Sequence, residues 1–282
     1  MSTREPVPTW TFLERFRIPK EAGSISWASV RFWQEAADDS LKRVEPELQR
    51  LSGEWREALS PLGEISEVDW RLFRALPLER ELAWSDWLAH LIERSETGEF
   101  ARRLFGGHPD LPVTVGQPTV RREVLTGDGT RIADLLIEWK VAVAHVEVKV
   151  GDSSFVKTFD TAEKLLRDER AEHGALRAWV DFILLPPSDL DRWLDIAEKH
   201  RGSRAEIKPL TWRDVAVALR AVLRNAKESL PWRAWAHSFC GAVEQRLLGC
   251  EPASTLGSRA RAPLARLAAA SIQIDIMKEA MK

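Results

Sequence analysis

The sequence contains no tyrosine and few cysteines, although tryptophan occurs 13 times among its 282 residues. The two cysteines, Cys240 and Cys250, are too few for the disulfide framework of a small secreted domain, which favours a reducing compartment. No apolar run approaches the length of a membrane span, and the N-terminal residues do not begin a signal peptide. We therefore expect a cytoplasmic protein that makes no contact with a membrane.

An excess of charge of one sign is also lacking, because the formal net charge is only −2. Such a chain has no global basic field to attract nucleic acid, so any nucleic-acid groove must be local. The six histidines are scattered without a zinc-binding spacing, and no glycine-rich phosphate loop follows a predicted strand. Ser85 lies outside any Gly-x-Ser-x-Gly motif. These absences argue against zinc sites, nucleotide-hydrolysing cores and serine hydrolases.

With 44% hydrophobic residues, the chain can form one large domain with terminal additions. We expect residues 1–66 to form a helical N-terminal extension, residues 67–250 the main domain, and residues 251–282 a linker with a C-terminal helix. Residues 1–25 read as an extended lead-in, and Pro46 should kink or split the first helix. Hydrophobic periodicity predicts helices over residues 26–59, 67–76, 78–94, 100–105, 155–172, 190–200, 211–226, 231–248 and 264–282. It predicts strands within residues 113–125 and over residues 131–137, 144–150 and 179–185.

Two of these predicted strands carry charged residues among apolar ones. In the strand over residues 144–150, small apolar residues alternate with His145, Glu147 and Lys149, so the last two lie side by side on one face. The preceding strand contains Asp134 within an apolar run, where an acid is costly to bury unless it is paired or binds a metal. The short connection between the strands favours an antiparallel pair. His145 shares the face of Glu147, and we interpret it as a surface imidazole rather than a residue that lines a site.

Two acids and a lysine on adjacent strands are what metal-dependent phosphodiester cleavage needs. The acids hold a divalent cation, and the lysine orients the attacking water or stabilises charge on the phosphate. The alternative is a salt bridge on a half-exposed sheet face, which contributes little to stability. A second Glu-x-Lys, at Glu206 and Lys208, follows a hydrophilic segment and runs into Pro209, so we do not expect it on a core strand.

A third acid, Glu81, begins an amphipathic helix, where the helix dipole alone would favour an acid. The ordered set Glu81, Asp134 and Glu147-Val-Lys149 resembles the PD-(D/E)XK nuclease superfamily, and in particular its bacterial group of nuclease-like proteins associated with phage defence. That group tends to carry Glu-x-x-His-Ser in the first helix, whereas this chain has Trp84 in place of the histidine. The resemblance extends over roughly residues 68–248.

The resemblance implies an α/β protein: an α-β-α sandwich with a restriction-endonuclease-like core, a helical N-terminal region and a helical C-terminal tail. It implies a Mg²⁺-dependent endonuclease, with Mn²⁺ as a substitute, that cleaves DNA in anti-phage defence or restriction. A further partner would be a defence-complex protein or a second copy of the chain. The implied catalytic residues are Glu81, Asp134, Glu147 and Lys149, the three acids also holding the metal. The predicted substrate-binding residues are Lys157, Lys164 and Ser85.

One departure concerns the helix after the second strand, where the group often carries glutamine and tyrosine but this chain has Lys157, Thr161 and Lys164. Two alternatives to an autonomous nuclease therefore stay open. One is a catalytically silent module on a nuclease fold that binds nucleic acid or protein, which the near-neutral charge favours. The other is an effector that a partner activates, with tryptophans of the N-terminal region at the interface.

Overall fold

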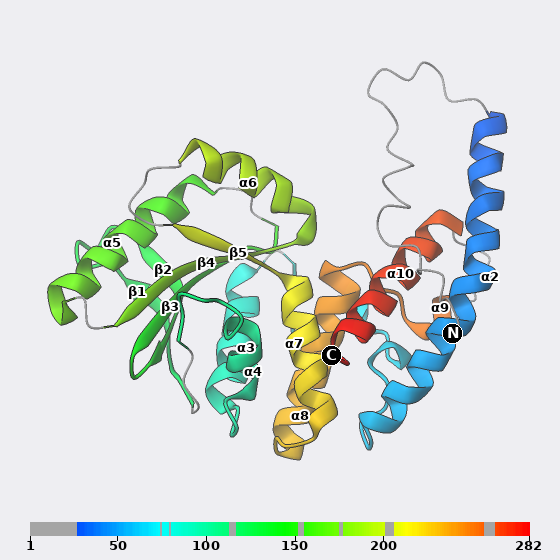
Figure 1. The fold of residues 1–282 in the computed structure, drawn as a ribbon, viewed down its shortest axis with the longest axis horizontal. Helices are drawn as coiled ribbons and strands as arrows, with labels where there is room; N and C mark the ends of the chain where they lie inside the picture. Colours follow the sequence, from blue (N-terminus) through cyan, green and yellow to red (C-terminus); the bar gives the residue numbers. More distant parts are fainter. Residues whose placement is uncertain are drawn as a thin grey trace, which may run out of the picture.

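The structure is a computed structural model and describes residues 27–73, 75–78, 80–112, 117–151, 155–174, 177–200, 206–256 and 263–282. It is a mixed α/β protein with a five-stranded sheet in the order β1-β2-β3-β4-β5 and helices at both ends of the chain (Figure 1). The α/β class predicted from the sequence is therefore confirmed. The predicted lead-in over residues 1–25 lies outside the described residues. Within those residues, no helix is both long enough and apolar enough to cross a membrane.

The sheet is antiparallel at one edge and parallel at the other. β2 pairs antiparallel with both β1 and β3, while β3, β4 and β5 are parallel to one another. The predicted antiparallel pairing of β2 and β3 is confirmed, with Trp139 opposite Ala142 across the turn. The strands are β1 Thr119–Leu125, β2 Ile132–Trp139, β3 Ala142–Val148, β4 Ala178–Leu185 and β5 Ile207–Thr211.

β5 corrects our expectation for the second Glu-x-Lys. Lys208 lies on this strand, opposite Phe182 of β4, and its ammonium group pairs with Glu206. Pro209 does not prevent the pairing, because an edge strand tolerates a missing N–H on its outer side. The expectation was wrong because it depended on the hydrophilic residues before Glu206, which do not prevent the next residues from forming a strand.

Helices cover the two faces of the sheet (Figure 1). On one face, α5 and α6 pack over Ile183 and Leu185 through Phe159 and Trp193. On the other face, α3, α4 and α7 pack over apolar residues such as Val146. The helices are α2 Trp27–Ala58, α3 Glu81–Arg94, α4 Glu99–Phe105, α5 Val156–His173, α6 Leu190–Lys199, α7 Trp212–Asn225, α8 Leu230–Ala242, α9 Ala253–Leu256 and α10 Pro263–Glu279.

Two predictions about helices need correction. The predicted helix over residues 67–76 is wrong, since two short 3₁₀ turns, Ile65–Glu67 and Trp70–Leu72, occupy this region. Here the Trp70 N–H donates to the side chain of Gln245 at 2.8 Å, so a tertiary contact takes the donor that a helix would use. The first helix, α2, is also not split at Pro46.

Tryptophan accounts for much of the core volume. Five of its side chains are fully buried, namely Trp55, Trp84, Trp193, Trp212 and Trp232. The main hydrophobic cluster extends from Ala37 of α2 to Ala280 near the C-terminus, and α2 packs along α10. The terminal helices therefore share a core with the sheet, because aromatic side chains of this size bury much apolar area.

Candidate functional site

Asp134 and Glu147 lie on the sheet face that α5 and α6 cover. Leu135 pairs with Val146 across β2 and β3, so one step further along places Asp134 beside Glu147. Residues directly opposite each other in an antiparallel pair project to the same face. Asp134 Oδ2 also accepts a hydrogen bond from the Val148 N–H at 2.8 Å, which fixes this carboxyl against the end of β3. The two strands thus bring the two acids together.

Two further residues complete the cluster: Lys149, which directly follows β3, and Glu81 of α3. Lys149 Nζ lies 3.1 Å from Glu147 Oε1 and 3.7 Å from Glu81 Oε2. Glu81, in the first turn of α3, also accepts a hydrogen bond from the Val150 N–H at 2.8 Å. The structure therefore brings together all four residues of the predicted catalytic set, which we call the acid–lysine cluster.

Lys149 differs from the sequence interpretation in one respect. The pattern placed it beside Glu147 on a charged strand face, but only 7% of the residue is exposed. Its backbone is fixed as well, since its N–H donates to Leu184 at 2.7 Å and its carbonyl accepts from Trp212 Nε1 at 2.8 Å. Trp212 packs edge-on against Trp84, the residue that replaces the histidine of the resembling group. The indole of Trp212 thus holds the Lys149 backbone, and the indole of Trp84 packs against Trp212.

Burial controls the electrostatics of the cluster. Burial, and then the charge of Glu147, raise the pKa of Asp134 to about 7, against the opposing effects of the Val148 N–H and of Lys149. Burial on its own would lower the pKa of Lys149, but the neighbouring charges of Glu147 and Glu81 raise it above its ordinary value. The lysine therefore stays protonated at neutral pH, while burial and the neighbouring acid disfavour ionisation of Asp134.

Asp134 and Glu147 are the residues of the cluster that could hold a cation. Glu147 Oε2 is buried without a hydrogen-bond partner among the described residues, so this carboxyl has an unused acceptor. Among the residues that the structure describes, no group of three or more His, Cys, Asp or Glu side chains is arranged to hold a metal ion. Magnesium does not require such a cage, because it keeps several waters and takes one or two carboxylates.

The raised pKa of Asp134 predicts a pH-dependent stability. The folded carboxyl holds its proton up to about pH 7, whereas an unfolded one releases it near its ordinary value of 3.8. Its contribution to stability is therefore present at low pH and is lost as the pH rises through about 7. Without metal, Asp134→Asn should melt at a higher temperature than the wild type at pH 8 and at the same temperature at pH 3.5. Equal melting temperatures at pH 8 would contradict the burial argument.

The predicted substrate-binding residues lie in three different environments. The Ser85 side chain is buried within α3, and its hydroxyl donates to the Leu82 carbonyl at 2.9 Å. Lys164 Nζ is paired with Asp128 at 3.1 Å and Asp160 at 3.3 Å. Lys157, in the first turn of α5, is exposed. Lys157 is thus the best placed of the three to contact a phosphate, and all three assignments stay predictions.

Beside the cluster, one residue was wrongly interpreted from the sequence and two others were missed. His145 is fully buried, so its interpretation as a surface imidazole is wrong, and its Nδ1 lies 2.8 Å from Asp181 Oδ1. The signal that identified Asp134, an acid within an apolar strand, also holds for Asp181 in β4 and could have found it. Glu123 of β1, between the residues that pair with Leu135 and Ala133, adopts a φ of 48°. This strained conformation interrupts the strand pairing next to Asp134.

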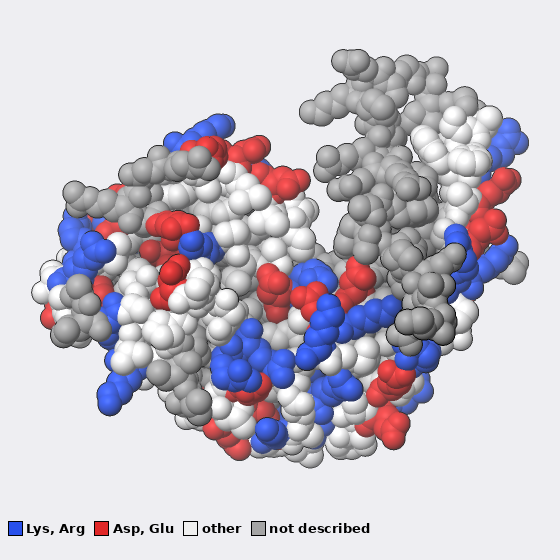
Figure 2. Space-filling model, viewed as in Figure 1, with Lys and Arg blue, Asp and Glu red and all other residues white. Residues whose placement is uncertain are grey.

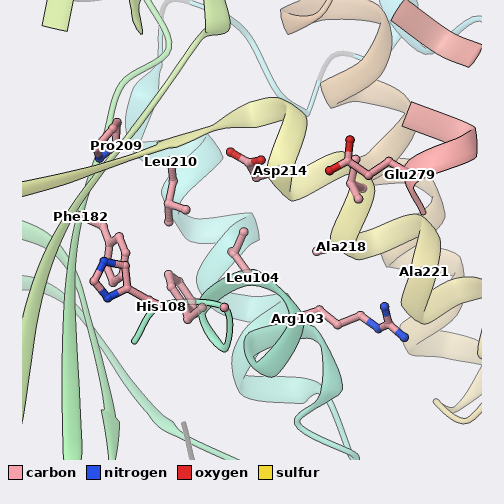
Figure 3. Close-up of a pocket in the computed structure, with 13 residues that line it drawn as sticks. Arg103, Leu104, His108, Phe182, Pro209, Leu210, Asp214, Ala218, Ala221 and Glu279 are labelled. Atoms are coloured by element: carbon pink, nitrogen blue, oxygen red, sulfur yellow. The ribbon is translucent and has the colours of Figure 1, made fainter. Parts of the chain in front are cut away.

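A pocket of about 420 Å³ lies elsewhere, between α4, β5, α7 and α10 (Figure 3). Leu104 and Ala218 line it, and its charged groups are already engaged. Arg103 pairs with Glu99 at 2.9 Å, and Glu279 pairs with Arg213 at 2.6 Å. Because it includes no residue of the acid–lysine cluster, it gives no support to the catalytic interpretation.

Comparison with known proteins does not identify the chain. No protein-family model matches it, and no curated protein matches it at a significant level. The geometry of the acid–lysine cluster is therefore the basis for a functional proposal.

Proposed function

We propose that this protein is a Mg²⁺-dependent nuclease with a restriction-endonuclease-like core that cleaves DNA. The observation that carries the proposal is the acid–lysine cluster, in which Lys149 Nζ lies within 3.7 Å of both Glu147 and Glu81 while Asp134 faces Glu147. A structural salt bridge needs one acid and one base, whereas this cluster holds three acids around one lysine. The surplus negative charge is what a divalent cation would neutralise.

The residues divide the chemistry between them. Asp134 and Glu147 would hold the metal, with Glu81 completing its shell directly or through water. The metal would supply Lewis acidity and lower the pKa of a bound water. Lys149 is held in place by the two glutamates and its own backbone bonds, so its ammonium can orient the attacking water or offset charge on the phosphate. Lys157 at the start of α5 would contact the DNA backbone.

The surface charge fits local contact with DNA rather than a broad basic groove. Figure 2 shows acidic and basic side chains intermixed over the coloured part of one face, in line with the net charge of −2. Affinity for DNA should then be modest, and it should fall with rising salt in proportion to the few phosphates contacted. A restriction or anti-phage role would also suit a protein whose partner increases that affinity.

The test is cleavage of plasmid and oligonucleotide DNA by the purified chain with Mg²⁺, Mn²⁺ or EDTA. We expect cleavage with either cation and none with EDTA. RNA of the same sequence serves as the competing substrate. Calorimetry with Mn²⁺ measures cation binding separately, so that a protein that binds the cation without cutting DNA can be recognised. Cleavage that persists in EDTA would contradict the proposal.

A second candidate is a silent or partner-activated binding module on the same fold. It is favoured by one observation: Lys164, a predicted phosphate contact, already has its charge matched by Asp128 and Asp160. Such a module would bind DNA or protein but leave DNA intact at every cation concentration. Addition of a partner protein that restores cutting would identify the activated form.

A further inference from the structure

A second buried pair of polar side chains lies on the same sheet face as the two metal-binding acids. His145 and Asp181 pair across β3 and β4, and their side chains are almost completely inaccessible. Trp179 Nε1 donates to Asp181 Oδ2 at 3.0 Å, which fixes the carboxylate, and Asp181 Oδ1 lies 2.8 Å from His145 Nδ1. An acceptor at Nδ1 makes that nitrogen the protonated one, so in the neutral ring Nε2 is an acceptor. The imidazole is therefore held at Nδ1, and Nε2 remains available to contact another group.

Two buried atoms of this face lack a hydrogen-bond partner among the described residues: His145 Nε2 and Glu147 Oε2. These residues are two apart on β3, so their side chains share a face. No hydrogen bond joins the two atoms directly. One water can bridge them in either protonation state of the ring, since it donates to Glu147 Oε2 and either donates to Nε2 or accepts from Nε2–H. Native proteins satisfy nearly all buried polar groups, and such a bridge would satisfy both atoms at once.

We propose that the Asp181–His145 pair positions the Glu147 carboxylate through a water molecule that bridges His145 Nε2 and Glu147 Oε2. The inference rests on the proposed function, because it takes Glu147 to be a metal-binding acid. His145 is a positioning residue, since it is fully buried and its Nδ1 is held by Asp181. Partners that orient metal-binding side chains in this way typically contribute 10- to 100-fold to metal affinity.

Two substitutions separate the roles of the two ring nitrogens. An asparagine amide lies near the place of Nδ1, and a glutamine amide reaches the place of Nε2. His145→Asn therefore keeps the contact with Asp181 and loses the group that faces Glu147, while His145→Gln does the reverse. We expect His145→Asn to weaken Mn²⁺ binding by about 10- to 100-fold and His145→Gln to stay within about threefold of the wild type. The kcat for DNA cleavage should follow the same order with little change in KM. The opposite order would show a merely structural pairing with Asp181 and overturn the proposal.

Circular dichroism and thermal unfolding establish that each variant folds. If neither variant folds, long-range ¹H–¹⁵N spectra of the wild type decide the question. Adding Mg²⁺ should then shift the Nε2 resonance of His145 and leave Nδ1 unchanged. An unshifted Nε2 overturns the proposal, and so does a Zn²⁺-induced shift typical of direct coordination. Wild-type protein that binds no Mn²⁺ removes both this inference and the proposed function. Equal Mn²⁺ affinity in the wild type and both variants removes the positioning role alone.

Discussion

Replacing Lys149 by methionine should lower kcat for DNA cleavage by about 100-fold or more, which is the typical effect of removing one charged or hydrogen-bonding group that acts on the transition state. Methionine is the better test than alanine because the residue is only 7% exposed, and truncation would leave a cavity. Removing the ammonium takes a positive charge from beside Glu147, which lies 3.1 Å from Nζ. Metal binding should therefore stay the same or become tighter while turnover is lost. That combination distinguishes a group that assists the reaction from one that builds the metal site.

Lys208→Met provides the matched control. Lys208 belongs to the other Glu-x-Lys of the chain, lies on β5 and pairs with Glu206, whose side chain is exposed. The Lys208→Met variant should cut DNA at the wild-type rate. An inactive Lys208→Met beside an active Lys149→Met would show that the wrong Glu-x-Lys was chosen. Equal cutting by both variants and the wild type would indicate a contaminating nuclease and favour the binding module.

The strands that carry the cluster could be predicted because their signals are local. Alternation along residues 144–150 fixes which side chains share a face, and the short connection to β2 leaves antiparallel pairing as the natural arrangement. Asp134 and Glu147 follow directly, since both stand out as acids in apolar strands. The contact between Glu81 and Lys149 joins residues that are far apart in the sequence, and it was predicted from the family resemblance.

What the sequence could not show depends on contacts between distant residues. Nothing near His145 indicates that it will pair with Asp181, because β3 and β4 are separated in the sequence by α5 and meet only in the folded sheet. β5 is short and contains Lys208 and Pro209, so its pairing with β4 overrides a weak local pattern. The 3₁₀ turns near Trp70 form because Gln245, far along the chain, takes the N–H that a helix needs.

Arg220→Met should destabilise the protein by about 3–5 kcal/mol, the usual cost of removing one partner from a buried ion pair. Arg220 is fully buried between Glu64 and Glu244, which are 1% exposed. Its guanidinium donates to Glu64 Oε1 at 2.9 Å and to Glu244 Oε2 at 2.8 Å, and it lies 5.1 Å from the ring of Trp55. Methionine fills similar space but leaves two carboxylates facing each other without a cation. Urea unfolding monitored by circular dichroism measures the loss.

Arg50→Met is the matched control, because Arg50 also lies between two glutamates, Glu47 and Glu54, but its side chain is 51% exposed. Exposed pairs contribute at most about 1 kcal/mol, so this variant should unfold close to the wild type. A triple variant that combines Arg220→Met with Glu64→Gln and Glu244→Gln should recover part of the loss, since it removes the unpaired charges. Similar small losses in both single variants would mean that the buried charges are not ionised as a set. A large loss confined to Arg220→Met would show that this one arginine of α7 holds together Trp55 of α2, Glu64 before the first 3₁₀ turn and Glu244 after α8.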